Sequence, residues 1–313
     1  MRYVVTGGNG FIGSHVVDQL LTTGKEVVVI DKITNQKNAY SKQVRHAARQ
    51  LFMDMSDPNL MEKAIQKDDV IVHLAAQSHV DVSFNNPVET TISNVVGAHS
   101  LLAASVKCGV SKVIIMSTDE VYGSTDRLID ENCLKPANPY SASKAAADMI
   151  ANAYKGMYKE LPIITLRSNN IAGPRQFIRN IIPRFSVLGL LGRHFTLHGD
   201  GSARRRYLWV GDAVDAICTL ALRGSQSKTY HIGTEEAFSN LEIAEKIGGY
   251  LELQDYISYE TDRLVNDSIY PSDSRDMQQD FGWQVTRKLD DFLPETIEWY
   301  RENLDDFTHY FQP

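Results

Sequence analysis

Two short stretches of the chain carry side chains that can move protons. In Tyr140-Ser141-Ala142-Ser143-Lys144, a phenol and an ammonium stand four residues apart, so on a helix they share one face. A nearby cation favours the phenolate and lowers the pKa of a phenol from about 10 toward neutrality. Tyr140 could therefore act as a base on an alcohol or sugar hydroxyl, with Lys144 tuning it.

The second stretch, Ser117-Thr118-Asp119-Glu120-Val121-Tyr122-Gly123, follows a strand-like apolar run. Ligands of open parallel sheets bind beyond the carboxyl ends of the strands. Asp119 and Glu120 suit general acid and general base chemistry if one stays protonated and the other ionised, and neighbouring like charges separate their pKa values. Composition alone favours the alternative, a solvated acidic loop.

A glycine-rich turn precedes both stretches. Gly7, Gly10 and Gly13 lie between the strand-like Tyr3–Thr6 and a helix that starts at Phe11-Ile12. This spacing allows a tight turn, a bare backbone beside a pyrophosphate and close packing of helix on strand, and a helix N-terminus attracts phosphate. The position favours a dinucleotide site over an ordinary glycine-rich turn.

The residues after the next two strand-like runs bear on which dinucleotide binds. Asp31 stands 18 residues after Gly13, where a carboxylate accepts hydrogen bonds from ribose hydroxyls and repels a 2′-phosphate. NAD is therefore favoured over NADP, although Lys32 could tolerate that phosphate and Asp31 could be a turn residue only. Asp54 and Met55 are weaker candidates to flank the adenine.

The spacing of apolar residues predicts the elements that position these groups. Short runs rich in Val and Ile alternate with helix-length segments, which is typical of a Rossmann-type, doubly wound parallel sheet in an α/β fold. The predicted strands are Tyr3–Thr6, Val27–Asp31, Val70–Leu74, Val113–Ser117 and Ile163–Arg167. The predicted helices are Phe11–Thr23, the stretch after Pro58, Val88–Lys107 and Pro139–Tyr158, the last one capped by Asn138.

The pattern changes after about residue 174. We expect a Rossmann domain over 1–173 and a smaller α/β substrate domain over 174–313, with 207–231 packing back on the first. Its predicted helices are Ile178–Leu191, Asp212–Leu222, one opening at the capping box Ser239–Glu242, and Leu289–Asn303. Its predicted strands are Arg205–Val210 and Lys228–Ile232.

Charge and composition exclude several classes. The 313 residues carry 32 basic and 39 acidic side chains, a net charge of −7, which argues against nucleic acid as a partner. The three cysteines are far apart and have no metal-ligand spacing, so we expect neither a disulfide scaffold nor a metal site. No apolar run approaches 18 residues, so no membrane span is expected. With no signal peptide in view, we expect a cytoplasmic protein.

With these motifs in place, the chain resembles the nucleoside-diphosphate-glucose 4,6-dehydratases of the extended short-chain dehydrogenase/reductase family. The resemblance extends to about Asn303, and Thr118-Asp119-Glu120 is its most specific part, because related sugar-nucleotide epimerases generally lack this carboxylate pair. The matching stretches are Gly7–Gly13, His73–Asp81, Ser117–Gly123, Tyr140–Lys144, Arg167–Asn170 with Gly173-Pro174, and His198–Gly201.

The resemblance implies an NAD-dependent lyase that oxidises the sugar at C4, eliminates water across C5 and C6, and returns the hydride to C6. It implies that Thr118 and Tyr140 address the sugar O4, that Asp119 protonates the leaving hydroxyl and that Glu120 removes the C5 proton. Lys144 would hold the nicotinamide ribose. Further implied cofactor contacts are Leu74, Ala75, Ala76 and Ser117, and implied substrate contacts are Ser78, Asn170, Arg205, Arg263 and Asn266.

The resemblance also implies a homodimer, paired through Val88–Lys107 and Pro139–Tyr158. His73 and His79 are expected to be packed side chains and not catalysts. Two family segments are altered. Arg175–Asn180 replaces a stretch that usually carries Pro-Glu-Lys, which leaves the roles of Arg179 and Asn180 open.

The second altered segment bears on the nucleotide. Leu264-Val265-Asn266-Asp267 replaces the Pro-Gly-His-Asp of bacterial dTDP-glucose enzymes. Asn266-Asp267, with the His198–Ser202 run, is more similar to the eukaryotic and viral enzymes, including the rhamnose-synthase module, and this similarity tilts the expected substrate toward UDP-glucose over dTDP-glucose. Two alternatives stay open. One is a sugar-nucleotide 4-epimerase or decarboxylase on the same scaffold, and the other is a non-catalytic NAD-binding protein.

Overall fold

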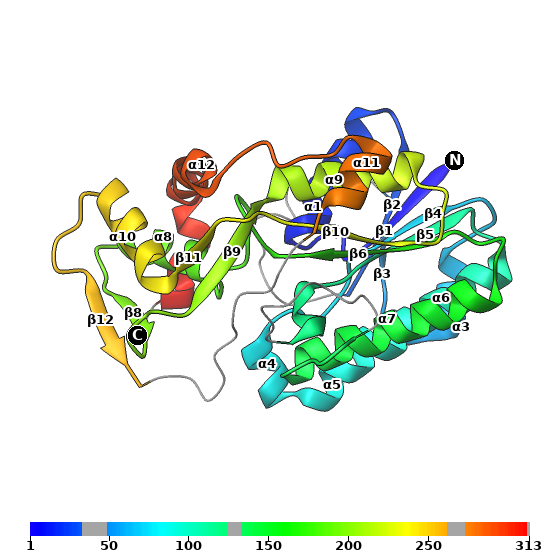
Figure 1. Ribbon diagram of the computed structural model, residues 1–313, viewed down its shortest axis with the longest axis horizontal. Coiled ribbons are helices and arrows are strands. Elements are labelled where there is room, and N and C mark those ends of the chain that lie inside the picture. The colour runs from blue at the N-terminus through cyan, green and yellow to red at the C-terminus, as the bar shows by residue number, and fades with distance from the viewer. Residues whose placement is uncertain (33–48, 124–132, 262–272, 312–313) are drawn as a thin grey trace.

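A seven-stranded parallel sheet forms the centre of the computed structural model, which describes residues 1–32, 49–123, 133–261 and 273–311 (Figure 1). The strand order is β10-β6-β5-β4-β1-β2-β3, and every neighbouring pair is parallel. The order reverses between β1 and β4, which makes a topological switch point. The strands are β1 (Arg2–Thr6), β2 (Glu26–Asp31), β3 (Arg49–Phe52), β4 (Val70–His73), β5 (Lys112–Met116), β6 (Ile163–Ser168) and β10 (Thr229–Ile232).

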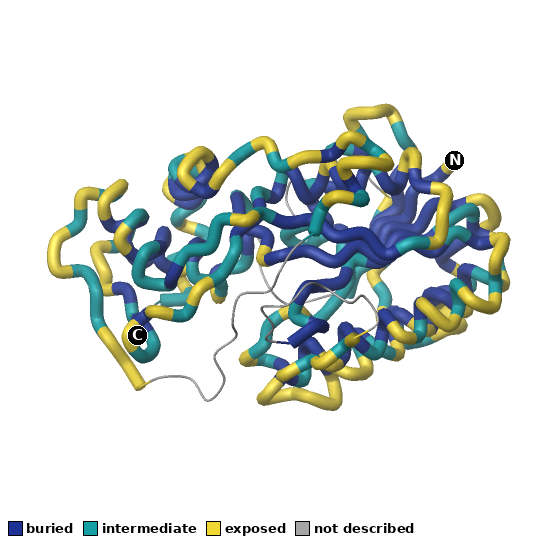
Figure 2. Tube along the Cα trace, in the orientation of Figure 1, coloured by how far each residue is buried: buried dark blue, intermediate teal, exposed yellow. Residues whose placement is uncertain are grey.

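Helices cover both faces of this sheet, so its strands, apart from the edge strand β3, are buried on both sides (Figure 2). Alternate residues of a strand therefore join different cores: Val5 packs with α1 and α9, while Val4 packs with α3 and α6. On the first face lie α1 (Phe11–Thr22), α9 (Val210–Arg223) and α11 (Arg275–Phe281). On the second lie α3 (Pro58–Ala64), α6 (Gly97–Cys108) and α7 (Pro139–Met157). This is the doubly wound fold that the sequence predicts.

The helix expected over Val88–Lys107 is divided in the structure. After α4 (Val80–Asn85), the chain forms α5 (Pro87–Thr91), then a π-helical turn η1 (Ile92–Val96), and then α6. Such turns often carry a side chain inward at a functional site. Here the turn buries Asn94, whose amide nitrogen donates to the Gln77 carbonyl oxygen (2.9 Å) and to Ser143 Oγ on α7 (2.8 Å).

The later part of the chain builds two small sheets and three helices. β7 (Asn170–Ala172), β9 (Arg204–Trp209) and β11 (Ala237–Ser239) form one sheet, and β8 (Phe195–His198) pairs with β12 (Ile257–Glu260). The helices are α8 (Ile181–Leu190), α10 (Asn240–Tyr250) and α12 (Leu289–Glu302), followed by the 3-10 turns η3 (Leu304–Asp306) and η4 (Thr308–Phe311). Their apolar faces share a separate core.

Part of this later segment returns to the large sheet. β10 is its edge strand, paired with β6, and α9 packs on α1. Packing of 207–231 against the first part is thus visible, whereas the domain boundary near residue 173 stays a prediction. Across the described ranges, no helix has both the length and the apolar character needed to cross a membrane.

Candidate active site

The glycine-rich turn is as tight as its spacing predicts. Gly7 has φ +68°, and a Cβ on Gly13 would lie 2.1 Å from the Gly7 carbonyl oxygen, so no side chain fits there. A Cβ on Gly7 would lie 2.7 Å from the backbone nitrogen of Ala75. Helix α1 begins at Phe11 directly after Gly10, so the first amides of the helix, including those of Phe11 and Ile12, have no partner within the helix. The bare turn fits a pyrophosphate.

Asp31 lies at the end of β2, beside this turn. Its carboxylate accepts hydrogen bonds from the backbone amides of Asn9 (2.9 Å) and Lys32 (2.8 Å). Burial raises its pKa, and those two amides oppose the rise. The Lys32 ammonium lies 3.0 Å from an Asp54 oxygen, so the cation that could tolerate a 2′-phosphate is engaged by a carboxylate. Asp31 and the turn together fit the adenosine half of NAD.

The other predicted cofactor contacts lie around the same sheet edge, but Met55 differs from the rest because it is part of the apolar core. Met55 is 6% exposed and belongs to the apolar core, where it packs beside Gly97 of α6. Leu74 and Ala75 follow β4, and their amides donate to Thr6 Oγ1 (3.2 and 3.3 Å). Ala76 is half-buried and Ser78 is exposed. Contacts of these residues with cofactor or substrate stay predictions.

Tyr140 and Lys144 lie on the buried face of α7, which starts at a capping box made by Asn138 and Ser141. Tyr140 forms a hydrogen bond with Thr118, so the two residues predicted to address one sugar hydroxyl are in contact. Lys144 Nζ donates to the Met116 carbonyl oxygen at the end of β5 (2.6 Å). Ser117, which follows Met116, donates from Oγ to Asp148 Oδ2 (2.9 Å). The structure thus brings together the phenol, the ammonium and Thr118.

The pKa of Tyr140 moves in the direction opposite to the one expected from Lys144. It is raised, first by burial and then by the negative charges of Glu120 and Asp119, and the bond with Thr118 opposes this rise. Lys144 is itself buried, which lowers its pKa, and its ammonium donates a hydrogen bond to the Met116 carbonyl oxygen. The expectation of an activated phenol is therefore wrong for this arrangement, because burial outweighs the nearby cation.

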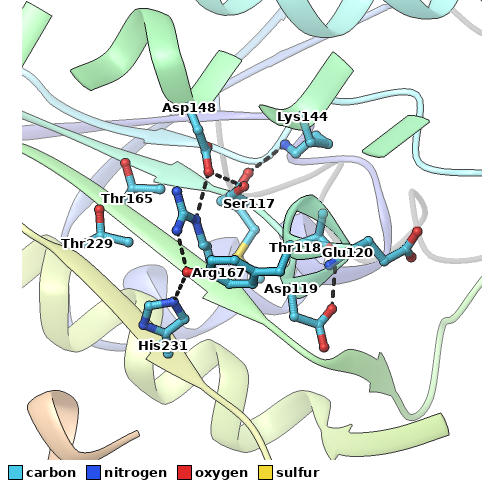
Figure 3. Close-up of polar contacts among 12 residues, drawn as sticks. Ser117, Thr118, Asp119, Glu120, Lys144, Asp148, Thr165, Arg167, Thr229 and His231 are labelled. Carbon is cyan, nitrogen blue, oxygen red and sulfur yellow. Dashed lines mark hydrogen bonds and ion pairs between the residues drawn. The ribbon is translucent and has the colours of Figure 1, made fainter. Parts of the chain in front are cut away.

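The carboxylate pair lies on a 3-10 turn, η2 (Asp119–Tyr122), that follows β5 (Figure 3). Asp119 is 5% exposed, and its oxygens accept hydrogen bonds from Asn169 Nδ2 (2.7 Å) and Thr118 Oγ1 (3.3 Å). Burial raises the pKa of Asp119 to about 7. Glu120 is half-buried and accepts from Asn138 Nδ2 (3.3 Å). A solvated acidic loop does not describe this turn, and a carboxyl that titrates near pH 7 suits a general acid.

Two asparagines of the site were not assigned to it from the sequence. Asn138 is more than a helix cap, because its Oδ1 accepts from the Ser141 amide while its Nδ2 donates to Glu120. Asn169 is 4% exposed and bonds Asp119, whereas its neighbour Asn170 is exposed. Asn169 lies between the last residue of β6 and the first residue of β7, and no local pattern in the sequence marks its contact with Asp119.

The structure gives less information on the predicted substrate contacts. Asn170 lies on β7 and Arg205 on β9, where the Arg205 guanidinium donates to the carbonyl oxygen of Arg204 (2.8 Å). Arg263 and Asn266 lie outside the described residues. Arg179 is exposed, with its guanidinium 6.0 Å from the Phe177 ring.

Asn180 precedes α8, and its Nδ2 donates to the Phe177 carbonyl oxygen (3.2 Å). His73 and His79 are packed as expected: burial lowers their pKa values to about 3 and about 4.

Together, the sheet order, the glycine turn and the Tyr140–Lys144 pair define a Rossmann-type fold of the short-chain dehydrogenase/reductase class. The chain belongs to the GDP-mannose 4,6 dehydratase family, whose sequence pattern it matches over residues 4–296.

Curated relatives point to the same chemistry. The chain is 34% identical to "dTDP-D-glucose 4,6-dehydratase" of Mus musculus over 97% of its own length and 89% of the relative's. It is 36% identical to a trifunctional protein of Arabidopsis thaliana whose name includes UDP-glucose 4,6-dehydratase, over 96% of this chain and 47% of that protein.

Solved structures are equally similar. A dTDP-glucose 4,6-dehydratase from Streptomyces venezuelae, determined with NAD bound, gives a TM-score of 0.91 at 35% identity and covers 97% of this chain and 98% of that one. A UDP-glucose 4-epimerase from Thermotoga maritima, determined with UDP-glucose, gives 0.89 at 28% identity, covering 97% and 100%.

Proposed function

We propose that this protein is an NAD-dependent dehydratase that converts a nucleoside-diphosphate glucose into the 4-keto-6-deoxy sugar nucleotide. The observation that carries the proposal is the buried Asp119, which has a pKa of about 7 and is adjacent to Glu120. The negative charges of both carboxylates act on Tyr140 and raise its pKa. An epimerase on this scaffold needs no acid and base pair for eliminating water. A protein that merely binds NAD needs none of these groups.

The cofactor would be held by the Gly7–Gly13 turn, by Asp31 at the adenosine ribose and by Lys144 at the nicotinamide ribose. Bound NAD supplies a hydride acceptor for C4 of the sugar and later the hydride donor for C6. The Asp31 carboxylate at the end of β2 and the engagement of Lys32 by Asp54 support NAD over NADP.

The chain's own side chains handle the protons. Tyr140, in contact with Thr118, takes the proton of O4 as C4 becomes a ketone. The C5 hydrogen is then α to a carbonyl and acidic, so Glu120 can remove it. Asp119 gives its proton to the C6 hydroxyl, the C6–O bond breaks, water leaves and a C5–C6 double bond forms. A proton then returns to C5, and the cycle is redox-neutral overall.

The raised pKa of Tyr140 adds a requirement to this sequence of steps. Burial and two nearby carboxylates both disfavour the phenolate, so the Tyr140 phenol stays protonated at neutral pH. A cation must therefore approach the phenol when the sugar is oxidised. Lys144 is the cation that this chain offers, since it lies four residues away on the same face of α7. Its ammonium would have to leave the Met116 carbonyl oxygen and form new contacts with the nicotinamide ribose and with the Tyr140 phenol.

The test is incubation with UDP-glucose and with dTDP-glucose, followed by alkali and a scan for the 4-keto chromophore. We expect UDP-glucose to give the higher kcat/KM, and a single methyl discriminates by only about 10- to 200-fold. Substrate deuterated at C4 is expected to give product deuterated at C6. Higher kcat/KM with dTDP-glucose would reverse the nucleotide preference alone.

Variants separate the dehydratase from its alternatives. Glu120→Gln is expected to bind NAD normally and to lose on the order of 10²–10⁴ in kcat, the usual contribution of a positioned base. A galactose product without a 4-keto signal would establish an epimerase instead. Deuterium released to solvent, or near-normal turnover in Glu120→Gln, would contradict the mechanism.

A further inference from the structure

A buried ion pair lies behind the catalytic groups and has no part in the mechanism above. Arg167 on β6 and Asp148 on α7 are each 1% exposed, and Arg167 Nε lies 2.9 Å from Asp148 Oδ2 (Figure 3). Isolating two charges from water costs several kcal/mol per ion, and their attraction often does no more than offset this. Stability alone is therefore a weak reason for such a pair.

Asp148 connects the two halves of the site. Lys144 and Tyr140 stand four and eight residues before it, on the same buried face of α7. Its Oδ2 also accepts from Ser117 Oγ (2.9 Å), and Ser117 directly precedes Thr118 and the carboxylate turn. One carboxylate oxygen thus ties the helix that carries the phenol and ammonium to the loop that carries the acid and base.

Arg167 anchors the far end of the same turn. Its Nη1 donates to the hydroxyl of Tyr122, the last residue of η2. The same hydroxyl forms a hydrogen bond with Nε2 of His231 on β10, 2.6 Å away. Burial together with Arg167 lowers the pKa of His231 to about 4, so this imidazole is neutral at pH 7. The turn is therefore held at both ends by groups bound to one ion pair.

We propose that Asp148 is a positioning residue of the dehydratase, an inference that rests on the proposed function. Through Ser117 it fixes the Thr118-Asp119-Glu120 turn relative to α7, and through its charge it sets the protonation of Lys144 and Tyr140. Arg167 on β6 neutralises the charge of Asp148. The ion pair therefore serves to position the turn and to set the electrostatic potential at Lys144 and Tyr140.

The surrounding charges define what this field does. Tyr140 is faced by Asp119 and Glu120 from the β5 turn and by Asp148 from its own helix. Lys144 is close to His73 of β4, whose pKa it lowers, and to Asp148, which raises the pKa of Lys144 against the effect of burial. Removing the negative charge of Asp148 therefore lowers the pKa of the phenol and of the ammonium together.

The decisive variant is Asp148→Asn, which keeps the size of the side chain and lets its amide oxygen accept from Ser117 and Arg167. Its amide nitrogen would take the place of Oδ1, which has no hydrogen-bond partner among the residues that the structure describes. We expect the acidic limb of the kcat–pH profile to move to lower pH by on the order of one unit. KM for the sugar nucleotide and Kd for NAD should stay within about twofold, because Asp148 lies behind the site.

Asp69→Asn is the matched control. Asp69 is 1% exposed, as Asp148 is, and forms an ion pair at 2.6 Å with Arg2, which is 9% exposed, at the opposite end of the strands, near the start of β1 and of β4. It should lose thermal stability with no change in the kcat–pH profile. Ser117→Ala separates geometry from charge: kcat should fall severalfold with no pH shift.

A readout independent of turnover distinguishes this inference from the proposed function. The pKa of Lys144 can be followed by ¹⁵N NMR of labelled lysine, assigned with Lys144→Met, and should be lower in Asp148→Asn than in the wild type. If the wild type gives no 4-keto product, the dehydratase proposal is wrong, and an unchanged Lys144 pKa would refute the role of Asp148 separately.

An Asp148→Asn variant that resembles Asp69→Asn, with reduced stability and an unshifted pH profile, would reduce Asp148 to a structural residue. If Asp148→Asn does not fold, wild-type kcat in Ser117→Ala would overturn the positioning role. Asp148→Glu, which keeps the charge, should then keep the wild-type pH profile with a lower kcat, and a shifted profile would overturn the role of the charge.

Discussion

Asp119 and Glu120 are adjacent in the chain, but the fold gives them different surroundings. Asp119 points into the protein and is held by Asn169, while Glu120 is half-buried and held by Asn138. Two like carboxyl groups acquire separate roles when one is desolvated more than the other. Burial, and not residue type, therefore assigns the acid.

The pH dependence of turnover follows from this assignment. In the proposed mechanism Asp119 must carry a proton to release the C6 hydroxyl, and burial raises its pKa to about 7. Below pH 7 the Asp119 carboxyl is mostly protonated, and above pH 7 it is mostly ionised. The kcat for the elimination should therefore fall about tenfold per pH unit as the pH rises past that value. Rapid-quench measurement of the elimination across pH 5.5–9 checks this. A rate that stays constant up to pH 9 would exclude Asp119 as the acid.

The same pKa makes a prediction about stability. An aspartate in the unfolded chain titrates near 3.9, so the folded protein retains this proton between about pH 4 and pH 7, and stability is lost as pH rises through that window. Asp119→Asn removes the buried charge. It should unfold like the wild type near pH 4 and be more stable at pH 8, by on the order of 2–4 kcal/mol. Denaturant titrations at both pH values test it, and an equal difference at the two would contradict the raised pKa.

At the residue scale, we expect the preference for NAD over NADP to depend on Asp31. Asp31→Ala removes a charged acceptor for the ribose hydroxyls, which is worth about 1.5–3 kcal/mol, or roughly 10- to 150-fold in NAD affinity. The difference between the affinities for NAD and NADP should narrow, because Asp31 no longer repels the 2′-phosphate of NADP. Calorimetric titration with both cofactors measures this. Unchanged NAD affinity would leave Asp31 as a residue that merely closes the Asn9 turn.

At the scale of elements, the start of α1 is fixed by backbone packing against the turn. Gly13→Ala places a methyl group 2.1 Å from the Gly7 carbonyl oxygen, so the helix or the turn must move. We expect a loss of NAD affinity of at least tenfold and a lower melting temperature. Gly249→Ala on α10 is the control, since no atom lies within 4 Å of its added Cβ and alanine favours a helix by about 1 kcal/mol. Equal behaviour of the two variants would mean that the turn tolerates a side chain.

The elements that the sequence predicted best are those with a single strong periodic signal. Apart from the edge strand β3, the strands up to β6 are buried on both faces and read as Val- and Ile-rich runs, and α7 begins at a clear cap. β7, β8, β11 and β12 have only three or four residues each, too few for a period to show. Their pairing depends on contacts between distant segments.

The site shows the same division between local and long-range information. Residue types and spacing identified Tyr140, Lys144, Asp119 and Glu120, because each motif is local. The contacts of Asn169 with Asp119 and of Asn138 with Glu120 join residues 50 and 18 positions apart, and no local pattern reports them. The direction of the Tyr140 pKa was wrong for the same reason: desolvation depends on the whole fold.

The arrangement of the whole molecule bears on its oligomeric state. Along α5, η1 and α6, the exposed residues Val88, Ile92, Val96 and Ala103 recur at helical spacing. Met149, Ala153 and Met157 are exposed on α7, which packs beside α6. Val88, Met149 and Met157 are 71%, 64% and 68% exposed. Apolar and small residues on two adjacent helices form a face suited to close packing of helices.

We therefore expect a homodimer in which this two-helix face packs on its own copy as a four-helix bundle, as the family resemblance implies. Burying a Val or Met side chain is worth about 1.5–3 kcal/mol, so a buried carboxylate in its place should dissociate the dimer. Light scattering coupled to gel filtration should report a dimer for the wild type and a monomer for Met149→Glu. Leu222→Glu on α9, 41% exposed on the other side of the sheet, should stay dimeric. A monomeric wild type would contradict this prediction. Dissociation by Leu222→Glu and not by Met149→Glu would show that the two-helix face is not the interface.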